Sequence, residues 1–392
     1  MPEPRLIRVG LSDLGRTDLP GRDLFSAALA EAFEGLPDPA ELVDALYVGN
    51  QSEQYENQIM QGTLMAQWAG LRHVPAERVE GCAAAGALAL NHAVSDVETG
   101  VHDAVIACGV EKMTASGTEG ATNALAAAFD RALEQRSGVT APSQYALIAQ
   151  RYLHEFDVDE EDLARIAVKN HRNGAQNPHA MFQKEIDVET VMESPPVARP
   201  LKLYDCAPVT DGAAVALVTT PELADELVPR DEQLAIGGAS TANNISVAER
   251  NLTFIEGAHR AAERAYETMG VDAADVDVAE VHDAFTVCEA LLSEAVGFAP
   301  RGSGVESARH PAERSDGWTD VHLNTSGGLK ARGHPIGATG VAQAAEAYDQ
   351  LTGQAGARQV DDADTALLVN EGGVADAVTA AHVLVGPDGG AR

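Results

Sequence analysis

Four short segments of this chain carry side chains and turns that could do chemistry. The first is a Gly–Cys–Ala turn within RVEGCAAAGALAL (78–90), where we expect a strand to end and a helix to begin. The unpaired N–H groups and the dipole at a helix N-terminus would lower the pKa of a thiol and stabilise an oxyanion. Because an isolated cysteine is often buried packing, Cys82 and Ala83 become candidates only in combination with the other segments.

A histidine in a glycine-rich loop is the most specific signal. In NTSGGLKARGHPIGATG (324–340), five glycines surround one His–Pro pair. The glycines let the backbone approach a ligand closely, and the proline helps to fix His334 in a tight turn before a helix. An imidazole held in this way suits general-base work or hydrogen bonding to a developing oxyanion.

Two further segments follow predicted strands. His282 stands in VHDAFT (281–286), and a His–Asp pair at a strand end points to the rim where α/β enzymes bind ligands. The segment NEGG (370–373) follows the run ALLV, and its adjacent glycines free backbone N–H groups to point at a substrate oxygen. The alternatives are a structural histidine and an ordinary tight turn.

The elements that must position these segments form a regular alternation. Short apolar runs alternate with longer amphipathic stretches, which is typical of a mostly parallel sheet covered by helices. The turns at 81–86 and 327–340 are each followed by a helix and then a strand, so we expect two similar halves. The alternation predicts strands at 6–9, 45–48, 104–107, 213–218, 278–281 and 365–369, and helices that include 86–98 and 258–269.

Between residues 119 and 204 this alternation stops. Polar helical stretches, the segment KNHRNGAQNPHAMFQKE and a proline-bearing exit replace it. A long insertion of this kind can place a substrate lid on a rigid scaffold. A helical decoration without a function is the alternative.

The composition is that of an ordinary globular protein except for its charge. Sixty acidic residues and 27 basic residues leave a net charge of −33. Such a surface repels itself at low ionic strength, whereas at molar salt the Debye length falls to about 3 Å. We therefore expect a halophilic cytoplasm, with an acidic protein of an ordinary cell as the alternative. Nucleic acids and anionic membranes are unfavourable partners for this charge.

Other functional templates do not occur. The sequence has no GxGxxG after a strand, no GxxxxGK[ST], no HExxH and no GxSxG. His282 has no His or Cys three or four residues away, so no metal site is expected. The four cysteines form no CxxC pair, the N-terminus lacks a signal-like pattern, and no apolar run reaches eighteen residues. These features predict reduced thiols and a cytoplasmic location.

In this order, the segments resemble the thiolase family, and most closely its archaeal and sterol-carrier-protein-type branch. The resemblance covers nearly the whole chain and rests on GVEKMT (109–114), KNHRNGAQNPHAMFQ (169–183), DCAPVTDGAA (205–214), HDAF (282–285) and GGLKARGHPIGATG (327–340).

The resemblance implies an α/β fold with two similar βα halves in a five-layered αβαβα arrangement. The implied N-terminal half comprises 1–115 and 205–240, and the C-terminal half comprises 241–392. Residues 116–204 would form an inserted loop domain over coenzyme A and substrate.

The resemblance also implies a reaction on coenzyme A thioesters, with no permanently bound cofactor. A nucleophile takes an acyl group from one acyl-CoA, and the α-carbanion of acetyl-CoA then attacks that acyl group to give a 3-ketoacyl-CoA. Thiolysis is the reverse. His334 would activate the nucleophile, His282 would polarise the second acyl oxygen in place of the Asn in a NEAF motif, and the backbone at Gly372 would complete an oxyanion hole.

Two departures from the family pattern stand out. In relatives the nucleophile is followed by two residues and a glycine, as in CASG, so counting back from Gly86 puts the nucleophile position at Ala83. Since one residue rotates a side chain by about 100° on a helix, Ala83 is interpreted as a replaced Cys or Ser. Cys82 in an adjusted turn is the alternative.

The second departure concerns the acid/base cysteine. Relatives place it where this chain has Asn370, or within HDCF where this chain has Ala284. His282, or a water that it holds, is therefore the hypothesised proton abstractor.

Coenzyme A phosphates require local positive charge on this acidic protein. The candidate ligands lie in or beside the inserted segment and the His–Pro loop, apart from a serine where relatives contact pantetheine. They are Lys169, His171, Arg172, Lys184, Ser240 and Lys330.

Other functions remain open. A ketosynthase or hydroxymethylglutaryl-CoA synthase shares the fold, although the HDAF and GHPIGATG pairing disfavours it. A non-catalytic CoA-binding or scaffold subunit fits the absence of a reactive group at Ala83. The resemblance implies a homodimer or higher oligomer, and a separate OB-fold, zinc-ribbon subunit as a partner.

Overall fold

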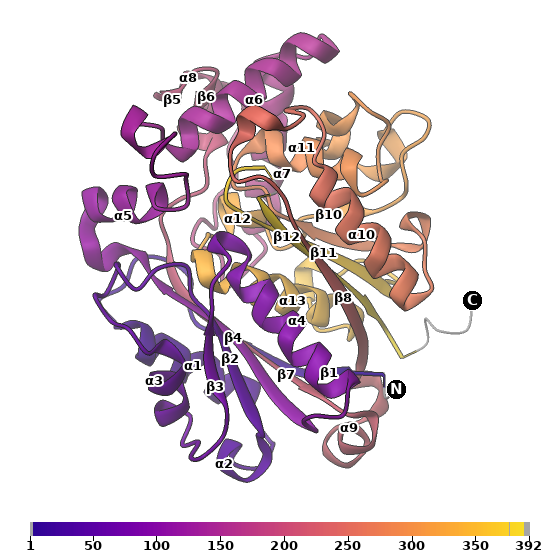
Figure 1. Ribbon diagram of the computed structural model, residues 1–392. Coiled ribbons are helices and arrows are strands. Elements are labelled where there is room, and N and C mark those ends of the chain that lie inside the picture. Colours follow the sequence, from indigo (N-terminus) through magenta and orange to yellow (C-terminus); the bar gives the residue numbers. More distant parts are fainter. Residues whose placement is uncertain (1–2, 376, 388–392) are drawn as a thin grey trace.

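The computed structural model describes residues 3–375 and 377–387, and ten strands of this part form one mixed sheet (Figure 1). The order across it is β10-β9-β11-β12-β8-β1-β7-β4-β2-β3. Its strands are β1 (Arg5–Leu11), β2 (Ala45–Gly49), β3 (Ala76–Val79), β4 (Ala104–Lys112), β7 (Asp211–Thr219), β8 (Leu234–Ala242), β9 (Val278–Val281), β10 (His322–Leu323), β11 (Thr365–Gly372) and β12 (Val378–Val385). A separate hairpin joins β5 (Pro196–Ala198) to β6 (Leu201–Lys202).

The two ends of this sheet repeat one pattern. In the N-terminal half, β3, β2 and β4 run parallel and are followed by the antiparallel strands β7 and β1. In the C-terminal half, β10, β9 and β11 run parallel and are followed by the antiparallel strands β12 and β8. The two similar halves predicted from the sequence are confirmed.

The strand β8 belongs to the C-terminal half. Eight of its residues pair with β12, whereas only Leu234 and Ala235 pair with β1. A boundary between residues 240 and 241, as the sequence suggested, would cut through this strand.

Helices form three layers around the two halves of the sheet, as Figure 1 shows. The central helices α4 (Ala85–Glu98) and α13 (Thr339–Leu351) share one apolar core with both halves. On the outer faces, α1 (Gly21–Ala32) and α3 (Gln61–Trp68) pack on the first half, and α10 (Glu256–Met269) and α11 (Thr286–Ala295) pack on the second. This is the predicted five-layered arrangement.

Glycine lets the central layer close tightly. A Cβ at Gly86 would lie 2.5 Å from the Gly337 oxygen, and one at Gly340 would lie 2.4 Å from the Ala87 nitrogen. The two central helices therefore meet at the ends that carry the predicted catalytic turns.

The inserted segment comes from the first half but packs on the second. It contains α5 (Gly117–Ala126), α6 (Ala141–Phe156), α7 (Glu160–Gly174) and α8 (Val188–Glu193). Three further helices lie outside this segment: α2 (Pro39–Leu42), α9 (Pro221–Leu227) and α12 (Gly328–Ala331). Tyr145 stacks on Phe285 with ring centroids 4.4 Å apart, and the Tyr152 hydroxyl donates to Glu294 at 2.6 Å. Within the described residues no helix combines the length and the apolar character needed to cross a bilayer.

Candidate active site

The four predicted segments converge at the N-terminal ends of the two central helices. The turn Cys82–Ala84 precedes α4, the turn Ile336–Ala338 precedes α13, and these two turns pack against each other and against the end of β11. A parallel bridge joins Val209 to His334. The rim of the sheet thus brings together groups that are far apart in the sequence.

Cys82 has a backbone that an L-residue rarely adopts. Its φ is +52°, in the left-handed region, and its N–H donates to the Glu80 carboxylate at 2.7 Å. It lies in a 3-10 turn, and the α-helix begins only at Ala85. Cys82 therefore lies in the turn before the helix, and the choice between Ala83 and Cys82 as the nucleophile position stays a prediction.

The sulfur of Cys82 faces backbone donors. Burial raises the pKa of the thiol to about 11, the N–H groups of Gly373 and Ala83 act in the opposite direction, and the carboxylates of Glu80 and Glu111 raise it further. Two N–H groups at one sulfur also form a site where an oxyanion on an attached acyl group would be stabilised.

The side chain of Ala83 points into packing. It is buried in a small apolar cluster with Tyr55, Met113 and Ile336. Cys82 packs against the same cluster from a less buried position.

The backbone donor at the end of β11 is Gly373. The sequence named Gly372, but Gly372 packs on the carbonyl of Gly81, where a Cβ would come within 1.9 Å of the oxygen. Gly373 has a φ of +79° and offers its N–H to the Cys82 sulfur. The paired glycines of NEGG contained the signal, but only the turn geometry distinguishes the two residues.

His334 is buried and held from both sides. Its backbone N–H donates to the Thr210 hydroxyl at 3.0 Å, and its Nδ1 lies 2.7 Å from the Thr339 hydroxyl. Thr339 uses its single hydroxyl proton on the carbonyl of Pro335 at 3.0 Å. With that proton engaged, the Thr339 oxygen accepts a hydrogen bond from Nδ1–H, which places the lone pair of His334 on Nε2.

His282 is buried beside His334, with perpendicular rings whose centroids are 5.1 Å apart. Its Nδ1 lies 3.1 Å from the amide nitrogen of Asn370. Burial and, to a lesser extent, the Arg332 guanidinium lower the pKa of His282 to about 3. Burial, with His282 and Arg332 as smaller causes, holds the pKa of His334 well below its usual value. Both imidazoles are neutral at physiological pH.

A buried carboxyl group that the sequence reasoning missed ties the turn before α13 to the backbone after β2. Glu111 accepts hydrogen bonds from the backbone of Gln51 at 2.7 Å and of Gly337 at 2.9 Å, and from the side chain of Asn50 at 2.8 Å. Burial raises its pKa to about 8, although these N–H donors oppose the shift. The stretch GVEKMT contained this residue without indicating its role.

Three of the predicted coenzyme A ligands are buried and face away from solvent, so those assignments are wrong. Lys169 pairs with Glu289 at 2.6 Å and donates to the carbonyl of Leu323 at 3.0 Å. His171 is 3 % exposed, and burial lowers its pKa to about 4. Lys330 is 2 % exposed, and burial lowers its pKa too. An ammonium or imidazole that is covered by protein cannot meet the phosphates of a surface-bound ligand.

The other three candidates are on the surface. Arg172 and Lys184 are exposed on the inserted segment, and Ser240 is exposed near the end of β8. They remain compatible with a ligand that enters from solvent.

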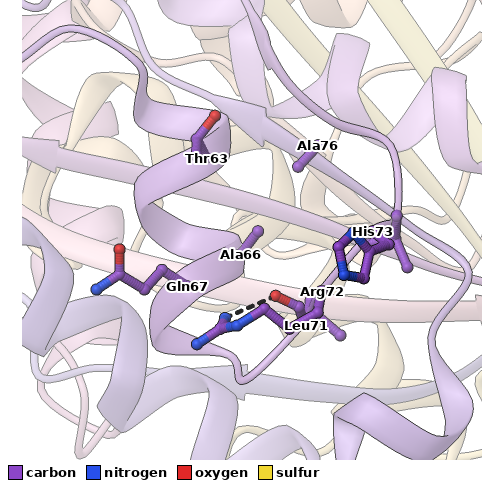
Figure 2. Close-up of a pocket in the computed structure, with 8 residues that line it drawn as sticks. Thr63, Ala66, Gln67, Leu71, Arg72, His73 and Ala76 are labelled. Carbon is purple, nitrogen blue, oxygen red and sulfur yellow. Dashed lines mark hydrogen bonds between the residues drawn. The ribbon is translucent and has the colours of Figure 1, made fainter.

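A cavity of about 450 Å³ lies elsewhere, between the C-terminal end of α3 and the start of β3 (Figure 2). Gln67, Arg72 and His73 line it, at the opposite end of β3 from Cys82. No predicted site residue lines this cavity.

Among the described residues no three His, Cys, Asp or Glu side chains are grouped as metal ligands.

Comparisons with known proteins agree with this geometry. Residues 8–222 match the family described as thiolase, N-terminal domain, and residues 237–385 match thiolase C-terminal domain-like. The acetyl-CoA acetyltransferase of Methanothermobacter thermautotrophicus is 39% identical over 94% of this chain and 95% of its own length. The benzoylsuccinyl-CoA thiolase subunit BbsB of Thauera aromatica is 33% identical over 90% of each chain.

A second group of relatives is longer than this chain. Human sterol carrier protein 2 is 32% identical over 77% of this chain and 57% of its own length. Among solved structures, the Ltp2-ChsH2(DUF35) aldolase covers 98% of both chains with a TM-score of 0.82 at 22% identity, which shows the shared fold. With both of its domains matched and its two halves built alike, the chain belongs to the thiolase family.

Proposed function

We propose that this thiolase-type acyltransferase catalyses Claisen condensation of acetyl-CoA with an acyl-CoA, and the reverse thiolysis, through an acyl group on Cys82. One observation carries the proposal. The thiol of Cys82 stands in a left-handed turn before α4, and its sulfur faces the N–H groups of Gly373 and Ala83. The names of the acetyltransferase and thiolase relatives support the substrate class.

The first half-reaction transfers the acyl group to the enzyme. The lone pair on Nε2 of His334 takes the thiol proton of Cys82 while the sulfur attacks the thioester carbonyl. The negative charge on the carbonyl oxygen is stabilised by backbone N–H groups. The tetrahedral intermediate collapses, the C–S bond to coenzyme A breaks, and the thiolate of coenzyme A leaves with the proton from His334.

The second half-reaction forms the carbon–carbon bond. The α-carbon of acetyl-CoA loses a proton to the Nε2 lone pair of His334, which is free again once coenzyme A has left as a thiol. The carbanion attacks the acyl carbon and displaces the sulfur of Cys82, which takes that proton back from His334. The thioester oxygen of acetyl-CoA gains charge as its enolate forms, and an N–H of His282 would stabilise that charge. We propose Arg172, Lys184 and Ser240 as contacts of coenzyme A, because they are exposed polar groups of which two carry positive charge.

A partner is part of the proposal. We infer a homodimer or higher oligomer, and a separate OB-fold, zinc-ribbon subunit. The solved structure of the same fold carries a name with two components, Ltp2-ChsH2(DUF35) aldolase, which supports an assembly of two kinds of chain.

The test is an intact-mass measurement after incubation with acetyl-CoA at molar salt, followed by peptide mapping. We expect a gain of about 42 Da from an acetyl group on the natural chain. The adduct should map to Cys82 and be lost in Cys82→Ala, which has no nucleophile at that position. An Ala83→Cys variant serves as the matched control. An adduct only on the introduced thiol would show that the nucleophile belongs at position 83. No adduct on either protein would favour a non-catalytic CoA-binding subunit.

A further inference from the structure

Two backbone carbonyls fix the orientation of a buried glutamine behind His282. Gln343, on α13, is fully buried, and its Nε2 lies 3.2 Å from the carbonyl oxygen of Glu280 and 3.4 Å from that of Val369. A carbonyl oxygen can only accept a hydrogen bond. The nitrogen of Gln343 must therefore face these carbonyls, and its Oε1 must face the other way.

The orientation of Gln343 determines that of Asn370. The Nδ2 of Asn370 lies 3.1 Å from the Oε1 of Gln343, and the same nitrogen lies 3.1 Å from Nδ1 of His282. If the amide of Asn370 were flipped, its oxygen would face the oxygen of Gln343, which would leave two acceptors in contact without a proton. Each of the two N–H bonds of Asn370 therefore has one acceptor.

The chain of hydrogen bonds ends at the imidazole. Because Asn370 donates to Nδ1 of His282, that nitrogen carries the lone pair, and the ring proton of the neutral imidazole is on Nε2. His334 has the opposite arrangement, since Thr339 accepts from its Nδ1. Two neutral histidines 5.1 Å apart thus present a donor and an acceptor.

We propose that Gln343 and Asn370 are positioning residues that hold His282 as the Nε2–H tautomer, so that it donates a hydrogen bond to the thioester oxygen. This inference rests on the proposed function, and it assigns the role of His282 within it. An imidazole in this tautomer has no free lone pair facing the substrate. His282 is therefore an oxyanion donor and not the group that removes the α-proton.

The experiment follows the tautomer directly by NMR on protein labelled with ¹⁵N-histidine at molar salt. The His282 signals are assigned by their loss in His282→Gln. The natural protein should show a proton on Nε2 of His282 and a lone pair on Nδ1. In Asn370→Asp the carboxylate can only accept, so the proton should move to Nδ1. The tautomer of His382, which is buried on β12 outside the site, should stay unchanged and serves as the internal control.

Kinetics on the same variants separate positioning from simple packing. Loss of one oxyanion donor should lower kcat of Asn370→Asp roughly 100- to 1,000-fold while KM for the acyl-CoA stays nearly constant. Gln343→Met keeps the side-chain volume but loses both hydrogen-bonding groups. We expect His282 to populate both tautomers in this variant. The fall in kcat should be about 10- to 100-fold, as for other residues that orient a functional histidine by a hydrogen bond. The melting temperature of each variant checks that it is folded.

Two results would overturn the inference. One is a proton on Nδ1 of His282 in the natural protein, and the other is an Asn370→Asp variant with both the natural tautomer and the natural kcat. The NMR result does not depend on turnover. If the tautomers are as expected but no acyl-enzyme forms, the proposed function fails while the positioning role stands.

Discussion

Cys82 and the two histidines of the site all lie in surroundings that favour their neutral forms. Burial raises the pKa of the Cys82 thiol to about 11 and lowers that of His282 to about 3. The pKa of His334 is also held low by burial and by neighbouring cations. A resting thiolate–imidazolium pair is therefore disfavoured, and proton transfer to His334 must accompany attack on the substrate.

Alkylation of Cys82 tests this conclusion about its charge. Only the thiolate reacts, so the rate of modification by iodoacetamide should rise about tenfold per pH unit from about pH 6 to pH 10, without a plateau. The thiol has its raised pKa above this window, so its thiolate fraction increases throughout. Stopped samples are mapped by mass spectrometry to count modification at Cys82 alone, with Cys82→Ser as the blank. A plateau reached below pH 8 would show a preformed thiolate.

Two helices determine where the catalytic turns lie at the scale of elements. Cys82 and His334 each precede a central helix. Because Gly86 and Gly340 have no side chain, the two helices lie closer together than a Cβ at either position would allow. Glu111 then ties the turn before α13 to the backbone after β2. The relative position of nucleophile and base is thus a property of helix packing.

Gly340→Ala should disturb this packing. Its new Cβ would meet the Ala87 nitrogen at 2.4 Å, so the backbone of one helix must move. We expect a loss of about 1–3 kcal/mol in the free energy of unfolding, measured by denaturant titration at molar salt. Ser95→Ala, on the exposed side of α4, is the control and should change stability by less than about 0.5 kcal/mol. Equal stability of the two variants would contradict the close-packing argument.

With 60 acidic and 27 basic residues, the whole molecule has a strongly acidic surface. Of its five lysines, Lys112, Lys169 and Lys330 are buried, and the first two are paired with the buried carboxylates of Asp211 and Glu289. With a net charge of −33, the surface depends strongly on counterions. Arg172 and Lys184, which we propose as contacts of coenzyme A, are among the exposed cations of the inserted segment.

Salt should stabilise this protein through screening. We expect the melting temperature to rise between about 0.1 M and about 3 M KCl, because the Debye length falls from about 10 Å to under 3 Å. Scanning calorimetry at several salt concentrations measures this rise. For a chain of this size, each kcal/mol of added stability should raise the melting temperature by about 2–4 °C or less. Sucrose at matched osmolality is the control, since it stabilises by exclusion from the surface and not by screening. A melting temperature that is insensitive to KCl would remove the basis for a halophilic origin.

The sequence by itself determined the elements and the segments that carry the site. All six predicted strands are present, and the helices predicted at 86–98 and 258–269 are α4 and α10 within two residues. His282 and His334 could be named because glycine spacing and strand ends are local signals. The strands β3, β8 and β10 were missed, since they are short, partly exposed or contain glycine and alanine in place of branched residues. The strand β12 was missed as well, although four of its eight residues are β-branched.

Only the tertiary structure decided which atoms face one another. Lys169 looks like a surface cation in the sequence, and its burial depends on packing against Glu289 and Leu323, more than a hundred residues away. The left-handed turn at Cys82, the N–H of Gly373 and the tautomer of His282 follow likewise from contacts between distant segments. The physical reason is that propensity and periodicity act within one turn or one strand, whereas burial and hydrogen-bond partners are set by the whole fold.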